Sequence, residues 1–276
     1  MRDPDCILVR VGEQALKSEQ VQKKWMGILL DNIRATLQKK KIKFSFGLNP
    51  NRIFIYTTER RKVKLVLRKI FGITSFSECW KCHSGLDEIK LLAVDLAEHI
   101  KIGKRTSFAI RARRAGWHKF SSRTVAEEAG AAVKRVTNAP VNLSKPRKEI
   151  FIETRSRNTY MFIKKESGVG GVPLGTGGQV CTILKGRRDL LASWLIMRRG
   201  CTMNAVVKNK ELLNKMKKWH LGKRVRILKN LKDCECKAII LAGEKNPKNI
   251  DDKMLFLRPL NGLLKKDRDT LTRIVG

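Results

Sequence analysis

The hydrophobic pattern of the first 83 residues changes between two periods. Apolar side chains at near-fourfold spacing predict helices, and short apolar runs between turn residues predict strands. Gly47, Asn49 and Pro50 lie between two of these runs and predict the turn of a β-hairpin. Strand, helix, strand, strand, helix and strand are predicted in that order at residues 7–10, 18–39, 42–46, 52–56, 60–71 and 73–77. This order predicts a ferredoxin-like domain over residues 1–83.

A second alternation of helices and strands predicts another domain over residues 84–166. One helix is predicted at 86–100, and a second begins at an N-cap, Ser121 or Ser122, and runs to about residue 136. Short strands are predicted at residues 107–113, 141–143, 149–154 and 159–163. Residues 101–150 hold 13 Lys and Arg against three Glu, so this part is more basic than the chain as a whole.

A glycine-rich segment at residues 167–178 separates these parts from a third one at 179–276. Its glycines, from Gly168-Val169-Gly170-Gly171 through Gly175, Gly177 and Gly178, predict a flexible or turn-rich linker. The third part alternates as a parallel α/β sheet does, with strands at 180–184, 203–207, 225–228 and 238–241 and helices at 190–199, 211–219 and 265–275. The predicted class is therefore a multidomain protein with α+β and α/β parts.

The charge of the chain points to a polyanionic partner. Lys and Arg number 60 against 25 Asp and Glu among 276 residues, a formal net charge of +35. Such an imbalance repels itself unless a polyanion is near, so nucleic acid is the first partner to consider. No apolar stretch reaches the ~20 residues that span a bilayer. We therefore expect a cytoplasmic protein without a membrane partner.

The basic residues of the second part are the candidate RNA contacts. Arg forks suit phosphate oxygens, and few aromatic side chains besides Trp117 and Phe120 are near for base stacking, so recognition of shape and backbone is favoured. A solvated basic surface is the alternative. The candidates are Arg111, Arg113, Arg114, His118, Lys119, Lys134, Arg135, Lys145, Arg147 and Lys148.

The cysteines and histidines predict no metal or catalytic site. Seven Cys without an export signal favour reduced thiols over a disulfide framework. Residues 79–83 spell the attachment pattern of a c-type haem, which also requires export and is rejected. Cys234 and Cys236 have no partner pair of matching spacing, and no Ser/His/Asp signature for nucleophilic catalysis occurs. We therefore expect no metal.

One strand-to-helix turn, residues 185–190, is a candidate anion site. A helix N-terminus presents free N–H groups to an anion. A loop that holds nucleotide phosphates needs several small residues, so that backbone N–H groups approach closely, and this turn has one glycine beside two long cations. ATP chemistry is therefore not favoured on local grounds.

A set of short motifs runs along nearly the whole chain. They are Val11-Gly12-Glu13 with Leu16-Lys17, residues 70–77, 108–114, 141–143, 152–155 and 168–178, and, later, 243–244 and 257–260. Together these motifs resemble those of one family, the tRNA 4-thiouridine synthetases (tRNA sulfurtransferases of thiamine-biosynthesis type). The resemblance implies an N-terminal ferredoxin-like domain, a THUMP domain and a shortened, Rossmann-like PP-loop domain.

The resemblance also implies a reaction, and the chain departs from its motif. In the family the first two domains hold the acceptor region of tRNA, and the PP-loop domain adenylates a uridine before a persulfide sulfur replaces the activated oxygen. The PP-loop reads Ser-Gly-Gly-x-Asp-Ser, of which this chain keeps only Gly186 and Asp189. We therefore expect a vestigial nucleotide loop without a cofactor, made of Lys185, Gly186, Arg187, Arg188 and Asp189.

The favoured hypothesis is a tRNA-binding protein that takes part in tRNA modification without its own ATP-dependent adenylation and without catalytic residues. Two alternatives stay open. One is an active tRNA sulfurtransferase, using ATP and Mg²⁺ for 4-thiouridine and thiamine thiazole sulfur transfer with an atypical loop. The other is an RNA-dependent scaffold for another modification enzyme. A sulfur donor, a partner enzyme and a homo-oligomer stay open as well.

Overall fold

The protein, described by a computed structural model, consists of two compact units built from interleaved segments. The described residues are 2–12, 18–49, 52–221, 223–243, 246–247, 250 and 253–275. The first unit contains residues 1–9, 44–60 and 76–166, and the second contains 10–43, 61–75 and 167–276. In the described part, no helix is long and apolar enough to cross a membrane.

The helices and strands alternate along the chain as the hydrophobic pattern predicts. In order they are β1 (Cys6–Val11), α1 (Glu19–Lys39), β2 (Ser45–Asn49), β3 (Arg52–Tyr56), α2 (Arg60–Leu67), β4 (Ile73–His83), α3 (Leu86–His99), β5 (Phe108–Ala115), α4 (Ser122–Thr137), β6 (Lys148–Arg155), β7 (Asn158–Phe162), β8 (Glu166–Ser167), β9 (Gln179–Leu184), α5 (Arg187–Arg198), β10 (Thr202–Val207), α6 (Lys210–Trp219), β11 (Arg226–Leu228), η2 (Leu231–Asp233), β12 (Ala238–Ile240), β13 (Leu255–Leu257) and α7 (Lys265–Val275). The α+β and α/β class is confirmed.

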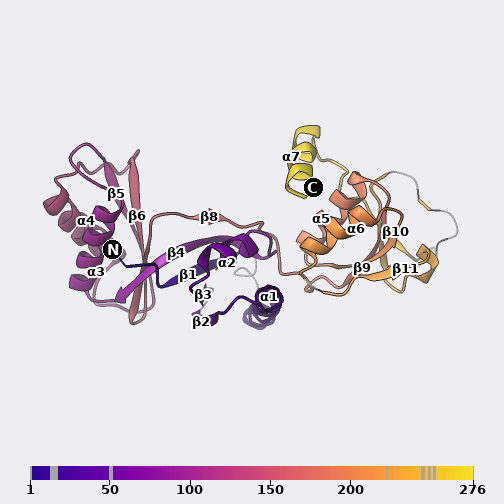
Figure 1. Ribbon diagram of the computed structural model, residues 1–276, viewed down its shortest axis with the longest axis horizontal. Helices are drawn as coiled ribbons and strands as arrows, with labels where there is room; N and C mark the ends of the chain where they lie inside the picture. Colours follow the sequence, from indigo (N-terminus) through magenta and orange to yellow (C-terminus); the bar gives the residue numbers. More distant parts are fainter. Residues whose placement is uncertain are drawn as a thin grey trace. The chain divides into compact units, whose positions relative to one another are not determined.

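An eight-stranded sheet carries the ferredoxin-like and second αβ parts. Its order is β2-β3-β1-β4-β7-β6-β5, with β8 beside β4, and the first four strands have the order of a ferredoxin-like sheet. In the first unit, α3 and α4 lie on one face of β5, β6 and β7 (Figure 1). Ile89 and Leu96 of α3 and Val125 of α4 are buried there against Phe108 and Ile152 of the sheet.

The predicted β-hairpin is present, with its second strand at the predicted residues 52–56 and its first strand three residues later than predicted. Ser45 pairs with Tyr56 and Asn49 with Arg52, so Gly47 and Asn49 belong to a strand rather than to the turn. Ile42 is buried, but it closes the end of α1, where its N–H donates to the Leu37 carbonyl. Ile42 was therefore predicted to begin a strand because it is apolar, although it belongs to the end of a helix. Pro50, Glu13, Leu16, Lys17 and Glu244 lie outside the described residues.

Three other predicted boundaries are wrong for a similar reason. Helix α2 ends at Leu67, and Phe71 is buried beyond it in a turn. Strand β4 continues to His83, since it pairs with β7. Residues 141–143 form no strand; Val141 makes one isolated bridge to Phe108. The strands β8 and β13 were not predicted, because two- and three-residue strands have no hydrophobic period.

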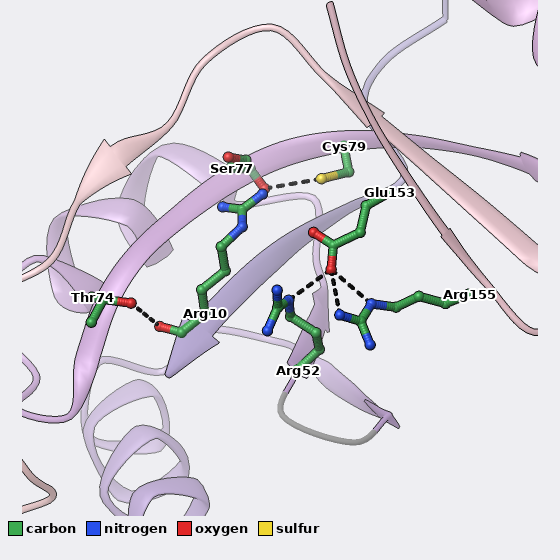
Figure 2. A network of polar contacts seen from close by, with 7 residues as sticks. All are labelled: Arg10, Arg52, Thr74, Ser77, Cys79, Glu153 and Arg155. Atoms are coloured by element: carbon green, nitrogen blue, oxygen red, sulfur yellow. Dashed lines mark hydrogen bonds and ion pairs between the residues drawn. The ribbon is translucent and has the colours of Figure 1, made fainter. Parts of the chain in front are cut away.

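A buried carboxylate joins distant strands of the first unit. The Glu153 carboxylate accepts hydrogen bonds from Arg52 Nε at 2.8 Å and from Arg155 Nε at 2.7 Å (Figure 2). Glu153 is 4% exposed, so these ion pairs are shielded from water. Burial lowers the pKa of the Arg52 guanidinium, and the Glu153 charge opposes that shift.

The second unit contains a parallel sheet of order β11-β10-β9-β12-β13. Thr202 pairs with Gln179 and Ile239 with Cys181, so the carboxyl ends of β9, β10 and β12 meet at one edge of the sheet. The order reverses between β9 and β12, as it does in doubly wound nucleotide-binding sheets. Helices α5 and α6 are neighbours, and α7 lies beside α5 (Figure 1).

The glycine-rich segment is a packed strap and not a flexible linker. Gly168 and Gly170 donate backbone hydrogen bonds to the carbonyls of Thr74 and Ile73, and Val172 donates to that of Arg198. Gly171 has φ +74°, and a Cβ at this position would collide with the Arg198 carbonyl oxygen. Of the two kinds of linker that the sequence predicted, flexible or turn-rich, the structure has the turn-rich one, in which glycine allows close backbone approach.

Aromatic packing holds the same unit together. Phe71 lies with its ring centroid 5.7 Å from Trp194 of α5 and 5.7 Å from Trp219 of α6. The two tryptophans are 5.5 Å apart, and Phe71 and Trp194 are almost fully buried. Asn32 of α1 is also buried and donates to the Leu174 carbonyl at 3.0 Å. Residues 10–43 and 61–75 are thereby fixed to the parallel sheet's helices.

A disulfide and a buried histidine complete the core of the second unit. Cys181 and Cys234 form a disulfide, which corrects the expectation of reduced thiols throughout; 53 residues of sequence separate them. His220 is fully buried, and its Nε2 accepts the Met203 N–H while Nδ1 faces the Lys223 carbonyl. Nδ1 is then the protonated nitrogen of a neutral ring. Burial lowers the pKa of His220.

Replacing Glu153 with Ala is expected to destabilise the fold by about 3–5 kcal/mol, since two guanidinium groups stay buried without their carboxylate. Urea denaturation of the two proteins measures the difference. Glu127→Ala, which removes one partner of the exposed pair with Arg123, is the control and should leave the midpoint unchanged. Equal midpoints for Glu153→Ala and the parent protein would contradict the assignment.

The neutral His220 predicts a stability that falls in acid. Its folded pKa is below the unfolded value of about 6.5, so the unfolded chain binds the proton more readily. The stabilisation is complete above that unfolded value and decreases as the pH falls below it. Melting temperatures between pH 8 and 5.5 should fall less in His220→Gln than in the parent, whereas the exposed His83→Gln should follow the parent.

The disulfide predicts a thiol count. Denatured protein purified without reductant should show five reactive thiols, and reduced protein seven. Closure of a loop of this length stabilises by about 4 kcal/mol in the chain-entropy account, so reductant should lower the melting temperature. Cys201→Ser should respond to reductant as the parent does, and Cys181→Ser should not respond. Seven thiols without reductant would refute the pairing.

Candidate RNA-binding surface and nucleotide-type loop

A groove of about 550 Å³ lies beside the edge strand β5 of the first unit. Helix α4, strand β5 and the loop at 141–143 form its walls. The lining residues are Phe108, Ile110, Arg111, Arg123, Ala126, Glu127, Gly130, Ala131, Lys134, Val141 and Leu143. The small side chains of α4 leave room for this groove, and positively charged side chains surround it.

Two of the predicted RNA contacts, Arg111 and Lys134, line this groove together. Arg111 is held in place, because its Nε donates to Glu149 at 2.7 Å and its NH2 to the Leu143 carbonyl at 2.7 Å. A fixed guanidinium loses less conformational entropy when it binds a phosphate. Lys134 is exposed in the last turn of α4.

Three other predicted contacts are already engaged in local structure. Lys148 donates its ammonium to the Ile100 carbonyl and to the Lys101 carbonyl, at the C-terminal end of α3. Arg147 NH1 donates to the Arg105 carbonyl at 3.2 Å. Arg114 NH1 donates to the Gly116 carbonyl at 3.2 Å. These cations stabilise loops, and Lys148, being half-buried, is the one least accessible to RNA.

The remaining predicted contacts are spread over nearby surface. Arg113, Lys119, Arg135 and Lys145 are exposed, and they do not line the groove. His118 is half-buried with its ring 5.5 Å from that of Phe120, and its Nε2 is buried with no hydrogen-bond partner.

Sequence reasoning missed two features of this surface, the position of Arg123 and the exposure of Val141 and Leu143. Arg123 lines the groove, although its Nε also pairs with Glu127 at 2.7 Å. Val141 and Leu143 are 47% and 64% exposed and give the groove an apolar side. Residues 141–143 were predicted to form a strand, so the exposure of Val141 and Leu143 was not expected. Trp117, at 79% exposed, is a further surface available for base stacking.

The nucleotide-type loop lies in the second unit, where β9 passes into α5. Gly186 is the N-cap of the helix, and Asp189 Oδ2 accepts the N–H groups of Gly186 at 2.8 Å and of Lys185 at 3.1 Å. The Asp189 carboxylate therefore forms a capping box with the N-cap of α5 and fixes the turn. Arg187 and Arg188 are exposed in the first turn of α5. The helix dipole favours acidic side chains at this position, and these two side chains carry the opposite charge.

A cavity of about 430 Å³ nevertheless lies at the reversal of strand order, above β9 and β12. Lys185 and Asp189 line it, with Ile183, Ile240, Leu241, Ala242, Gly243, Asn246 and Pro247. This is the place at which doubly wound sheets bind ligands. Arg187 instead lines a separate cavity of about 310 Å³ with Lys215 and Arg273. The five predicted loop residues thus face different surroundings.

Three cysteines form the metal-type cluster of the described residues. The sulfur atoms of Cys181, Cys234 and Cys236 all lie within 4.8 Å of one another. Asn204 Nδ2 donates to Cys236 Sγ at 3.2 Å. With Cys181 and Cys234 joined by a disulfide, Cys236 is the remaining thiol, and burial raises its pKa. Cys181 was missed because 53 residues separate it from its partner, so no spacing rule finds it.

Two family models match this chain. A ThiI ferredoxin-like domain matches residues 6–77, and a THUMP domain matches residues 83–164. A probable tRNA sulfurtransferase of Methanothermobacter thermautotrophicus is 37% identical over 209 residues, which are 74% of this chain and 52% of that protein. One from Methanosarcina acetivorans is 38% identical over 213 residues, 75% and 51% of the two chains. The chain spans about half the length of these curated relatives.

Two solved structures have the same fold. A crystal structure of PH1313 from Pyrococcus horikoshii superposes with a TM-score of 0.82 at 23% identity, over 99% of both chains. A 4-thiouridine synthetase, crystallised in an RNA complex with bound ATP, gives a TM-score of 0.76 at 18% identity over 99% of this chain and 85% of that one. Since the domains, the sequence relatives and the folds agree, the chain belongs to the tRNA sulfurtransferase family, whose ferredoxin-like and THUMP domains it carries.

Proposed function

We propose that this protein binds the acceptor region of tRNA and takes part in tRNA modification without adenylating the RNA itself. The observation that carries the second half is the sequence of the loop, which has Lys185, Arg187 and Leu190 where the family motif has serine, glycine and serine. The THUMP domain and the formal charge of +35 support the first half. This tRNA modification would take place in the cytoplasm.

The RNA contact is supported by the form of the α4–β5 groove. Its cations, Arg111, Arg123 and Lys134, come from two elements and face a space of about 550 Å³. The apolar Val141 and Leu143 beside them suit ribose and base surfaces, whereas the guanidinium groups suit phosphate oxygens. Relatives named tRNA sulfurtransferases and a synthetase solved with RNA make tRNA the favoured RNA.

The loss of adenylation is supported by the side chains of the loop. The family motif places a second glycine and a final serine where this chain has Arg187 and Leu190. An arginine side chain prevents the close backbone approach that glycine allows, and leucine offers no hydroxyl to a phosphate. Cations in the first turn also oppose the helix dipole by roughly 0.3–1 kcal/mol each.

An active sulfurtransferase is the second candidate, favoured by one observation. The cavity at the strand-order reversal has a volume of about 430 Å³ and keeps Lys185 at its rim. A cavity of this size is within the usual range of small-molecule sites. In this case ATP and Mg²⁺ would bind there, and a separate protein would supply the sulfur.

Arg123→Ala/Lys134→Ala, which removes two cations that line the α4–β5 groove, is expected to weaken binding of a tRNA transcript about tenfold at moderate salt, because two phosphate contacts are lost. The plot of log affinity against log salt should become less steep by about 2. Fluorescence anisotropy over a salt series measures both quantities. The control removes two exposed lysines of α1, Lys23→Ala/Lys24→Ala, and should keep the parent's slope.

The same preparation tests adenylation. Incubation with ATP, Mg²⁺ and tRNA is expected to release no pyrophosphate above the level without tRNA. Release that depends on tRNA would overturn the proposal in favour of the active enzyme. Failure of the parent protein to bind tRNA at low salt would overturn the RNA-binding half.

A further inference from the structure

Three cysteine side chains meet on one face of the parallel sheet in the second unit. Cys181 lies in the central strand β9, and Cys234 and Cys236 lie in the segment between η2 and β12. Their sulfur atoms all lie within 4.8 Å of one another. Cys181 and Cys234 are joined as a disulfide, and Cys236 is a free thiol beside it. The cluster therefore contains one sulfur more than the cross-link needs.

The alternation of side chains along β9 explains why Cys181 faces this cluster. Thr182, the next residue, hydrogen-bonds to Ser193 of α5 at 2.7 Å, so it faces that helix. Because neighbouring residues of a strand point to opposite faces of a sheet, Cys181 faces away from α5. It is fully buried there, and Cys236 is 9% exposed. The apolar cluster on this face consists of Cys181, Val206, Leu228, Cys236, Ile239 and Leu241.

One buried polar side chain is directed at the sulfur atoms. Asn204 of β10 is 4% exposed, and its Nδ2 donates a hydrogen bond to Cys236 Sγ at 3.2 Å. An N–H group that donates to sulfur stabilises the thiolate, which is the form of cysteine that binds a metal. A thiol that only fills space in an apolar core needs no such donor. Asn204 therefore indicates a role for Cys236 beyond packing.

The segment that carries Cys234 and Cys236 has the charge that a thiolate site requires. Of its two carboxylates, Asp233 accepts the Asn230 N–H at 3.1 Å and Glu235 pairs with Arg226 at 2.8 Å, so both are engaged locally. Three thiolates around a divalent ion carry a net charge of −1, which neighbouring cations stabilise. The cations of residues 226–237 are Arg226, Lys229, Lys232 and Lys237.

The separation of the sulfur atoms suits a single metal ion. A Zn–S bond is about 2.3 Å long, so two sulfur ligands of a tetrahedral zinc ion lie about 3.8 Å apart. The three sulfur atoms are already within 4.8 Å of one another, so side-chain rotation brings them to one ion once the S–S bond is open. Among the described residues no other His, Cys, Asp or Glu joins this group, so water or an external donor takes the fourth position.

We propose that the reduced form of this cluster is a zinc site, with Cys181, Cys234 and Cys236 as its ligands. An external reductant of the thiol or phosphine class supplies two electrons to the S–S bond, and two protons complete the thiols. One Zn²⁺ then forms three Zn–S bonds and releases three protons. The disulfide and the ion exclude each other because both use Cys181 and Cys234. The site is independent of the proposed tRNA binding.

The test compares zinc binding by the untagged full chain before and after reduction with a phosphine. After equilibration with Zn²⁺ and a weak competing chelator, reduced protein should retain one zinc per chain through gel filtration, and unreduced protein none. Co²⁺ in place of zinc should give the visible absorption of a tetrahedral thiolate site. Zinc should also raise the melting temperature of the reduced protein, since the ion binds the folded chain.

Matched variants assign the ligands. Cys236→Ser keeps the disulfide pair, so unreduced it should melt as the parent does. Once reduced, its zinc affinity should fall at least about 100-fold, because losing a ligand costs more than losing an outer-shell partner. Asn204→Leu, which removes the donor to Cys236, should lower the affinity about tenfold. Cys201→Ser, which removes a half-buried thiol outside the cluster, should bind zinc as the parent does.

Several results would overturn the zinc site. The reduced parent protein would retain no zinc, or Cys236→Ser would retain as much as the parent. Zinc bound equally by protein with its disulfide intact would lie elsewhere in the chain. A loss of affinity in Cys201→Ser as large as that in Cys236→Ser would show that zinc binds thiols regardless of their position.

Discussion

Close backbone approach along the glycine-rich strap, residues 167–178, is the constraint on which the second unit depends. Gly171 lies against the Arg198 carbonyl, and Gly200, at φ +94°, leaves room for Thr176 where a Cβ would collide with it. Hydrogen bonds from the strap reach the carbonyls of Ile73 and Thr74 at one end and that of Gly200 at the other. The strap therefore joins the start of β4 to the end of α5 and the turn that follows it.

The many cations of the chain have two different roles. Some are matched within the fold: Arg52 and Arg155 hold the buried Glu153, and Lys148 binds the carbonyls at the end of α3. Others line the α4–β5 groove, where Arg111 and Arg123 pair with Glu149 and Glu127 nearer the surface. The first set of cations stabilises the folded chain. The second set raises the electrostatic energy of the protein until a polyanion is bound.

The nucleotide-type loop lies where the topology of a doubly wound sheet places a ligand site. The strand order places a cavity above β9 and β12, as in nucleotide-binding sheets. The backbone N–H groups at its edge already have an anion, the Asp189 carboxylate, and long cations follow them along the helix. The sheet topology thus determines where a ligand site lies, and the side chains at that site determine what it binds.

The sequence by itself determined most of the elements, because helices α1, α3, α4 and α7 and the parallel strands have clear hydrophobic periods. It also determined the family, through motifs that need no tertiary contact. Only the tertiary structure decided what depends on residues far apart in sequence: the Cys181–Cys234 disulfide with Cys236 beside it, the strap, and the aromatic cluster around Phe71. Periodicity reports which face of one element is buried, whereas these features depend on which elements meet.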